Sequence, residues 1–183
     1  SGKDTVITGS LLKGKYVSVH TGGDLSIESL QDSKTYTQNG KSIGLGIGTN
    51  LTKAGTVVQA GKGKENTDST YRSVTEQAGI YAGSKGYDIT VKGNTHLTGA
   101  VIDSKAEKEK NKLTTGTLTW EDIENKASYE SHGKTQTVSS DKVSSSNPLG
   151  ASVAMAVPVQ GSHSSITRVA IADGIIQTTE GKT

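Results

Sequence analysis

Histidine is the side chain that most readily binds metals and transfers protons near neutral pH. This sequence has four: His20, His96, His132 and His163. None lies at metal-ligand spacing from another, and no acidic residue completes a metal pattern beside them. We therefore expect surface or turn histidines and no bound metal.

Carboxylates are the other candidates for chemistry, because polysaccharide hydrolases and lyases use clustered acids. Asp24 and Asp88 each follow a glycine turn and open similar runs, so they could stack at equivalent corners of a repetitive fold. A sugar groove also needs aromatic residues, and these make up only 4% of the chain. Aspartate is favoured after such turns because its side chain bonds nearby backbone N–H groups. We predict turn roles for both residues and no enzyme activity.

Three further motifs indicate no ligand or cofactor. The run Gly22–Ile27 departs from the calcium-binding nonapeptide at its fourth and sixth positions. Gly44, Gly46 and Gly48 are not followed by the Lys-Ser/Thr of a phosphate loop. Asn50-Leu51-Thr52 is a formal glycosylation sequon in a threonine-rich chain, where it arises easily by chance.

Composition narrows the class of protein. The formal net charge is +2 with no basic stripe and no interleaved aromatics, which argues against a nucleic-acid partner. Cysteine is absent, so disulfides and thiolate metal sites are excluded. The chain has no Phe, one Trp and 23 Gly, so its interior must be filled by Val, Ile and Leu. Thin aliphatic interiors suit stacked β-coils.

Short alternating runs predict the elements that would position these residues. Val17–Val19, Leu25–Ile27 and Ile89–Val91 place aliphatics on one side and Ser or Thr on the other. Glycine and Asn/Asp clusters separate them. Strands this short, turning every few residues, predict the faces of a coil that climbs one strand spacing per turn. We expect about five coils with open ends.

Two segments interrupt the coil, at about 34–72 and about 128–167, with a turn near Lys53–Gly55 in the first. Each alternates large aliphatics with glycine or alanine, which predicts β-hairpin excursions; a disordered linker is the alternative for the first. Their bulky side chains would pack on the coil flank or face a membrane or partner. The candidate interaction residues are Ile43, Leu45, Ile47, Val153, Met155 and Val157.

Several stretches resemble a known repeat. They are Asp24–Asp32 followed by Tyr36, then Ser73–Gly83, Gly86–Ile102 and Asn111–Leu118 followed by Asp122–Asn125. These look like the repeat of filamentous-haemagglutinin-type exoproteins, which two-partner systems of Gram-negative bacteria secrete. The similarity is strongest to the second haemagglutinin-repeat region of contact-dependent growth inhibition effectors.

The resemblance implies an all-β fold, a right-handed parallel β-helix, with residues 1–183 forming one solenoid fragment of a longer exoprotein. It implies a secreted, cell-surface location and a role in carrying a C-terminal toxin across the target cell's outer membrane. The implied partners are the rest of the exoprotein, the outer-membrane transporter during export and the target membrane. No catalytic residue is carried over. The alternative function is an adhesive stalk that binds host or biofilm surfaces.

Overall fold

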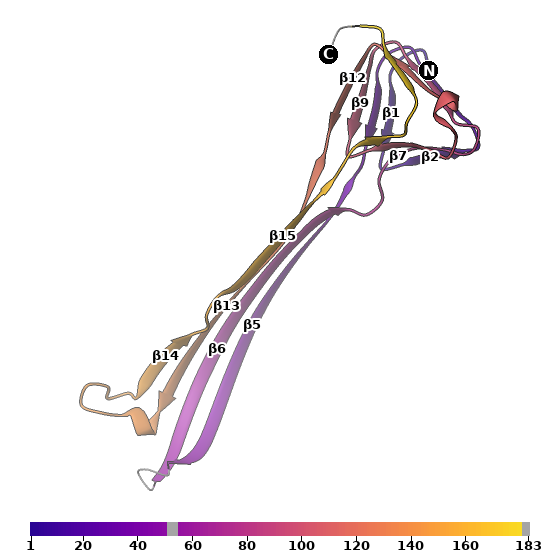
Figure 1. Ribbon diagram of the computed structural model, residues 1–183. Coiled ribbons are helices and arrows are strands. Elements are labelled where there is room, and N and C mark those ends of the chain that lie inside the picture. Colours follow the sequence, from indigo (N-terminus) through magenta and orange to yellow (C-terminus); the bar gives the residue numbers. More distant parts are fainter. Residues whose placement is uncertain (51–54, 181–183) are drawn as a thin grey trace. The chain divides into compact units, whose positions relative to one another are not determined.

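The computed structural model describes residues 1–50 and 55–180, which are built almost entirely from β-strands (Figure 1). Two compact units divide the chain. The coil unit comprises residues 1–33, 72–126 and 164–183, and the sheet unit comprises residues 34–71 and 127–163. Parallel sheets form the first and a five-stranded sheet the second. The protein is therefore all-β with parallel sheets, as the short alternating runs predict.

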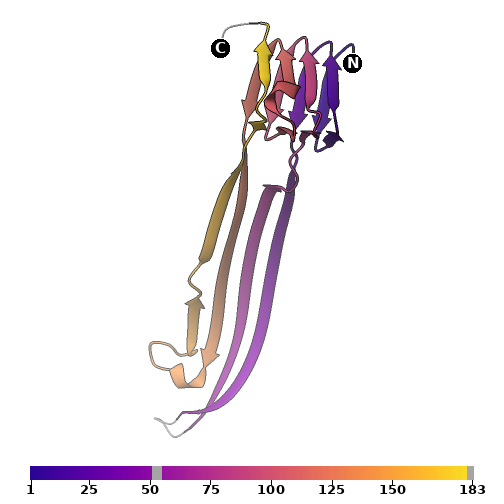
Figure 2. The same cartoon turned by 45° about the vertical axis from the view of Figure 1, so that its right-hand side comes forward.

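Three four-stranded parallel sheets make up the coil unit. The first contains β1 (Thr5–Thr8), β4 (Leu25–Glu28), β9 (Asn94–Thr98) and β12 (Thr117–Glu121). The second contains β2 (Leu11–Gly14), β7 (Gly79–Ala82), β10 (Val101–Ser104) and β16 (Ala170–Ile171). The third contains β3 (Val17–Thr21), β8 (Tyr87–Val91), β11 (Asn111–Thr115) and β17 (Ile175–Thr178), which Figure 2 shows side by side.

The chain visits these three sheets in turn, and each visit places one strand beside its predecessor in the same sheet. Each of these sheets has four strands among the described residues, whereas about five coils were expected.

Aliphatic columns fill the interior of the coil unit. One runs Val19–Ile89–Leu113 and ends at the exposed Ile176. Another runs Ile7–Ile27–Leu97 and ends at the exposed ring of Trp120. A third runs Leu12–Ile80–Ile102–Ile171. Ile89 and Val91 are 0% and 2% exposed, which confirms that they face inward. Complete burial of one such side chain contributes about 1.5–3 kcal/mol, so these columns hold the coils together.

A polar ladder links successive coils at one corner. The backbone N–H of Asp24 donates to Asp4 Oδ1 (2.9 Å), and the backbone N–H of Asn94 donates to Asp24 Oδ1 (2.7 Å). The Thr117 hydroxyl continues it by donating to Asn94 Oδ1 (2.8 Å). Each side chain thus satisfies a polar group in the adjacent coil. Asp24 bonds a backbone N–H 70 residues away, and not the nearby N–H groups expected of a turn role.

Glycine is required where the chain enters β8. Gly86 has φ of 75°, in the left-handed region, and a Cβ there would collide with the carbonyl oxygen of Lys110 in the adjacent coil. This glycine therefore permits both the turn and the close stacking of coils.

The sheet unit is built around β5 (Gln31–Asn50), β6 (Gly55–Val74), β13 (Ile123–Ser139), β14 (Ala151–Met155) and β15 (Val159–Thr167). The strand order is β14-β13-β6-β5, with β15 also pairing with β13. The long strands of the two excursions therefore join in one sheet, in which β6 pairs with β13 (Figure 1). The sequon Asn50-Leu51-Thr52 and the turn near Lys53–Gly55 lie largely outside the described residues.

Candidate interaction surface

The two faces of the five-stranded sheet carry different kinds of side chain. The register between neighbouring strands shows which residues share a face. Gly46 lies opposite Gln59, and Gly63 lies opposite both Ser42 and Thr135. Residues opposite one another on adjacent strands share a face. These contacts therefore define one face, made of glycine and small polar side chains, which we call the small face.

Alternation along each strand places the intervening residues on the opposite face. There β5 contributes Ile43, Leu45 and Ile47, and β14 contributes Val153 and Met155. Val153 lies opposite Gln136, and Met155 lies opposite Lys134. The sheet thus gathers five of the six candidate residues on one surface, which we call the aliphatic face.

The aliphatic face is uncovered in the sheet unit. Ile43, Leu45 and Ile47 are 89%, 85% and 80% exposed, and Met155 is 75% exposed. Val58 on β6 and Val138 on β13 are exposed beside them. Contiguous exposed aliphatics on a single sheet face are typical of a surface that binds an apolar partner.

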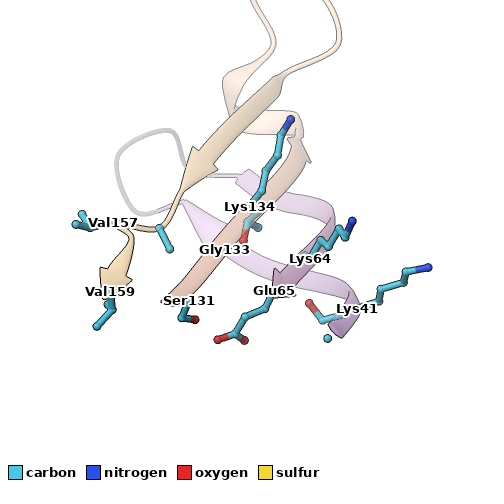
Figure 3. Close-up of a pocket in the computed structure, with 13 residues that line it drawn as sticks. Lys41, Lys64, Glu65, Ser131, Gly133, Lys134, Val157 and Val159 are labelled. Carbon is cyan, nitrogen blue, oxygen red and sulfur yellow. The ribbon is translucent and has the colours of Figure 1, made fainter. Parts of the chain in front are cut away.

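Val157, the sixth candidate, lies between β14 and β15 rather than on a strand. It is 84% exposed and lines a hollow of about 420 Å³ together with Gly133, Lys134 and Val159. Figure 3 shows this hollow, with Glu65 and Ser131 extending away from the lysines. Val157 therefore lies in the short segment that joins β14 to β15, not among the strand residues of the aliphatic face.

Four lysines on the aliphatic face were not among the candidate residues: Lys41, Lys62, Lys64 and Lys134. All are exposed, and they line a hollow of about 380 Å³ with Ile43 and Gln136. The period-two spacing of Lys62 and Lys64 is visible in the sequence. The cross-strand register that adds Lys41 and Lys134 is not.

The aspartates that could have served a hydrolase lie in different sheets. Asp24 precedes β4, whereas Asp88 lies within β8, opposite Ser18 and Lys112. The idea that they stack at equivalent corners is wrong, because Asp24 aligns with Asp4 and Asn94. Asp24 and Asp88 are therefore not paired with each other for acid and base roles.

Histidines lie at the surface in polar contacts. His96 hydrogen-bonds the Thr119 hydroxyl (2.8 Å), and His132 approaches Glu130 (2.8 Å). Across residues 1–50 and 55–180, no group of three or more His, Cys, Asp or Glu side chains could hold a metal ion. No helix in the described part of the chain is long and apolar enough to cross a membrane.

Two tyrosines in the coil unit have side-chain pKa values above the ordinary one. Burial raises the pKa of Tyr87 above its ordinary value, and the negative charge of Asp173 adds to the effect. Burial also raises the pKa of Tyr81, with smaller contributions from Asp103 and Glu76. Tyr87 donates to the Ala172 carbonyl (3.2 Å), and the Lys13 amine lies 5.4 Å from the centre of the Tyr81 ring. These contacts give both tyrosines structural roles in the coil unit.

Comparison with known proteins gives one family match and several relatives. Residues 1–43 match the haemagglutinin repeat family. The chain is 36% identical over 178 residues to a protein named tRNA nuclease CdiA from Yersinia mollaretii, covering 97% of this chain and 6% of that protein. It is 41% identical over 130 residues to Toxin CdiA from Escherichia coli, covering 71% of this chain and 4% of that protein.

A third relative carries a different name over the same region. Deoxyribonuclease CdiA from Yersinia pseudotuberculosis is 36% identical over 182 residues, covering 96% of this chain and 17% of that protein. The chain thus spans a small fraction of each of these relatives. No solved structure matches it.

Proposed function

Because this chain contains a haemagglutinin repeat and is 34–41% identical to CdiA proteins, which are contact-dependent growth inhibition toxins, we propose that it is a structural and delivery segment of such an effector. In this role it helps to carry a C-terminal toxin across the outer membrane of the target cell. It is not itself an enzyme.

One observation carries the proposal. The same stretch of sequence is similar to proteins named tRNA nuclease and deoxyribonuclease, although those names denote different substrates. A region shared by proteins with different activities is not the region that determines the activity. A shared structural or delivery task accounts for the similarity.

The fold supports this task. We take residues 1–183 as one stretch of a right-handed parallel solenoid within a longer exoprotein, with excursions at about 34–72 and 128–167. Coils stacked through aliphatic columns contact only their neighbours, so such a stack can be extended into a filament. Secretion through an outer-membrane two-partner transporter and display at the surface of a Gram-negative cell follow from the same assignment.

The exposed aliphatic face supports the delivery role over a passive spacer. A spacer needs only the coils, whereas Ile43, Leu45 and Ile47 remain uncovered in the sheet unit. A membrane would cover such a face, and burial of apolar surface contributes about 25 cal/mol per Å². We therefore assign the membrane-directed step to this sheet.

The test uses the complete exoprotein on the surface of inhibitor cells. Replacing residues 37–66 with a Gly-Ser linker removes most of β5 and β6 but also removes much of the pairing between β6 and β13. A second variant, Ile43→Thr, Leu45→Thr and Ile47→Thr, keeps the strand and removes only the aliphatic side chains. Its matched control changes three exposed aliphatics of the coil unit, Val6→Thr, Leu30→Thr and Ile175→Thr.

We expect the linker variant and the β5 triple variant to be exported and to bind target cells while toxin entry fails. The control should deliver toxin normally. Normal delivery by the β5 triple variant would refute the membrane role of the sheet. Binding of the chain to a glycan array, with unchanged delivery by both variants, would instead support the adhesive stalk.

A further inference from the structure

Four lysines lie close together in the strands that form one part of the aliphatic face. Lys41 and Lys64 lie in the same cross-strand row as Lys134, and Lys62 is the next residue of β6 on that face. Like charges opposite one another on a sheet are destabilising. Among the described residues, no salt bridge includes any of these four amines.

Glu65, the acidic residue that follows Lys64 in β6, does not relieve the repulsion. Glu65 lies opposite Gly40 on the small face, and Figure 3 shows it extending away from Lys41, Lys64 and Lys134. The lysines instead surround the hollow of about 380 Å³. An external anion in this hollow would offset the repulsion, and a phosphate group suits several lysines at once.

The lysines border the aliphatic residues directly. On β5, Lys41 is followed on the same face by Ile43, and on β13 Lys134 lies opposite Met155. Positively charged lysines beside exposed aliphatic side chains suit the boundary of a bilayer, where anionic headgroups meet acyl chains. Lysine stems can lie along apolar surface while their amines stay at the level of the phosphates.

Strand geometry limits how deeply this surface can enter a bilayer. From Ile43 to Ile47 the strand rises four residues, about 13 Å, against a hydrocarbon core about 30 Å thick. The sheet is also open, with β5 at one edge. Unpaired edge N–H and C=O groups are costly in hydrocarbon, so an isolated sheet of this kind cannot stand across the membrane.

We infer that the aliphatic face docks flat on an anionic phospholipid bilayer, with Ile43, Leu45 and Ile47 in the near leaflet and the four lysines on its phosphates. The small face remains toward water. This inference rests on the membrane-directed role proposed above. It adds which face of the sheet contacts the membrane, how deeply the side chains enter it and that the lipids are anionic.

Single-tryptophan variants of the 183-residue chain test the orientation. In a Trp120→Phe background, Leu45→Trp places a probe on the aliphatic face, and Gln59→Trp places one on the small face opposite Gly46. Vesicles contain phosphatidylglycerol with phosphatidylcholine, or phosphatidylcholine alone. We expect a blue shift of emission for Leu45→Trp only, with quenching by bromines near the headgroup end of the acyl chain and none by bromines at the bilayer centre.

Charge variants test the lysines. Lys41→Gln, Lys62→Gln, Lys64→Gln and Lys134→Gln should together weaken binding to phosphatidylglycerol vesicles about 100- to 1,000-fold, since each lysine near an anionic surface contributes about 1 kcal/mol. The matched control makes the same change at four exposed lysines of the coil unit, Lys85, Lys105, Lys108 and Lys112, and should bind nearly as the parent does.

The possible outcomes distinguish failure of this inference from failure of the proposed delivery function. Equal binding to neutral and anionic vesicles, or equal effects of the two lysine sets, would overturn the phosphate assignment and leave the membrane role standing. Quenching at the bilayer centre would overturn the flat orientation. Loss of vesicle binding in millimolar inorganic phosphate at constant ionic strength would mean a free-anion site. Failure to bind either vesicle would count against the membrane role itself.

Discussion

The side-chain Oδ1 of Asn125 accepts a hydrogen bond from the backbone N–H of Val74 at 2.9 Å, although 51 residues separate them in the chain. The same oxygen accepts from Gln31 Nε2 (3.1 Å), and Asn125 Nδ2 donates to Thr167 Oγ1 (2.8 Å). One buried carboxamide therefore ties together residues of β5, β6, β13 and β15 within the coil unit.

Substituting Asn125 should destabilise the coil unit. Asn125→Ala leaves the buried polar groups around it without partners, which costs about 1–3 kcal/mol in the free energy of unfolding. Asn125→Asp keeps the acceptor and loses the donor, so its cost should differ from that of alanine. Urea unfolding followed by circular dichroism measures both. Asn39→Ala, at an exposed position of β5, is the control, and an equal loss there would contradict the role of Asn125.

The inward register of the coil can be tested at adjacent positions. Ile89→Asp places a carboxylate in a fully buried aliphatic column and should cost several kcal/mol. Thr90→Asp faces outward and should cost little. Thermal unfolding of the two variants measures the difference. Similar destabilisation by both would mean that the register is wrong.

The buried phenol of Tyr87 should make stability fall at high pH. Because the folded pKa is raised, the unfolded chain loses its proton first, near pH 10.0, and stability declines from there through the folded pKa. Tyr87→Phe should lose about 1 kcal/mol below pH 10.0 from the missing hydrogen bond. The stability of Tyr87→Phe should also fall less steeply above that pH than the stability of the parent.

Urea unfolding of the parent and of Tyr87→Phe, measured between neutral pH and pH 11, gives the dependence of stability on pH for each. The upper limit is about one unit beyond the ordinary phenol pKa. Tyr81, whose pKa is also raised, accounts for the decline that remains in Tyr87→Phe. Tyr16→Phe, at an exposed ring, should reproduce the parent curve. An unchanged slope in Tyr87→Phe would show that its phenol is not responsible.

The terminal strand of the first sheet predicts self-association. Trp120 continues the column of Ile27 and Leu97 but is 62% exposed, since β12 is the last strand of that sheet within residues 1–50 and 55–180. An exposed strand edge beside an apolar ring favours pairing between copies. Sedimentation should show the 183-residue chain associating and Trp120→Lys reducing the association. Tyr16→Lys, outside the strands, serves as the control, and an equal reduction there would contradict the prediction.

Local patterns of the sequence account for much of this structure. Period-two alternation identifies the strands around Ile89 and Leu25, and Gly86 marks a turn, because side-chain direction and backbone freedom depend on neighbouring residues. The same alternation made Ile43, Leu45 and Ile47 candidates for an interaction surface. It correctly indicates that they share one face.

Register between strands required the tertiary structure. Asp24 and Asp88 look equivalent in the sequence, yet one caps a corner and the other lies within a strand of a different sheet. The pairing of β6 with β13, and the row that brings Lys41, Lys64 and Lys134 together, likewise join distant segments. Which residues become neighbours is decided by long-range strand pairing, because a slip of one residue would send every side chain to the opposite face while leaving each strand's own pattern unchanged.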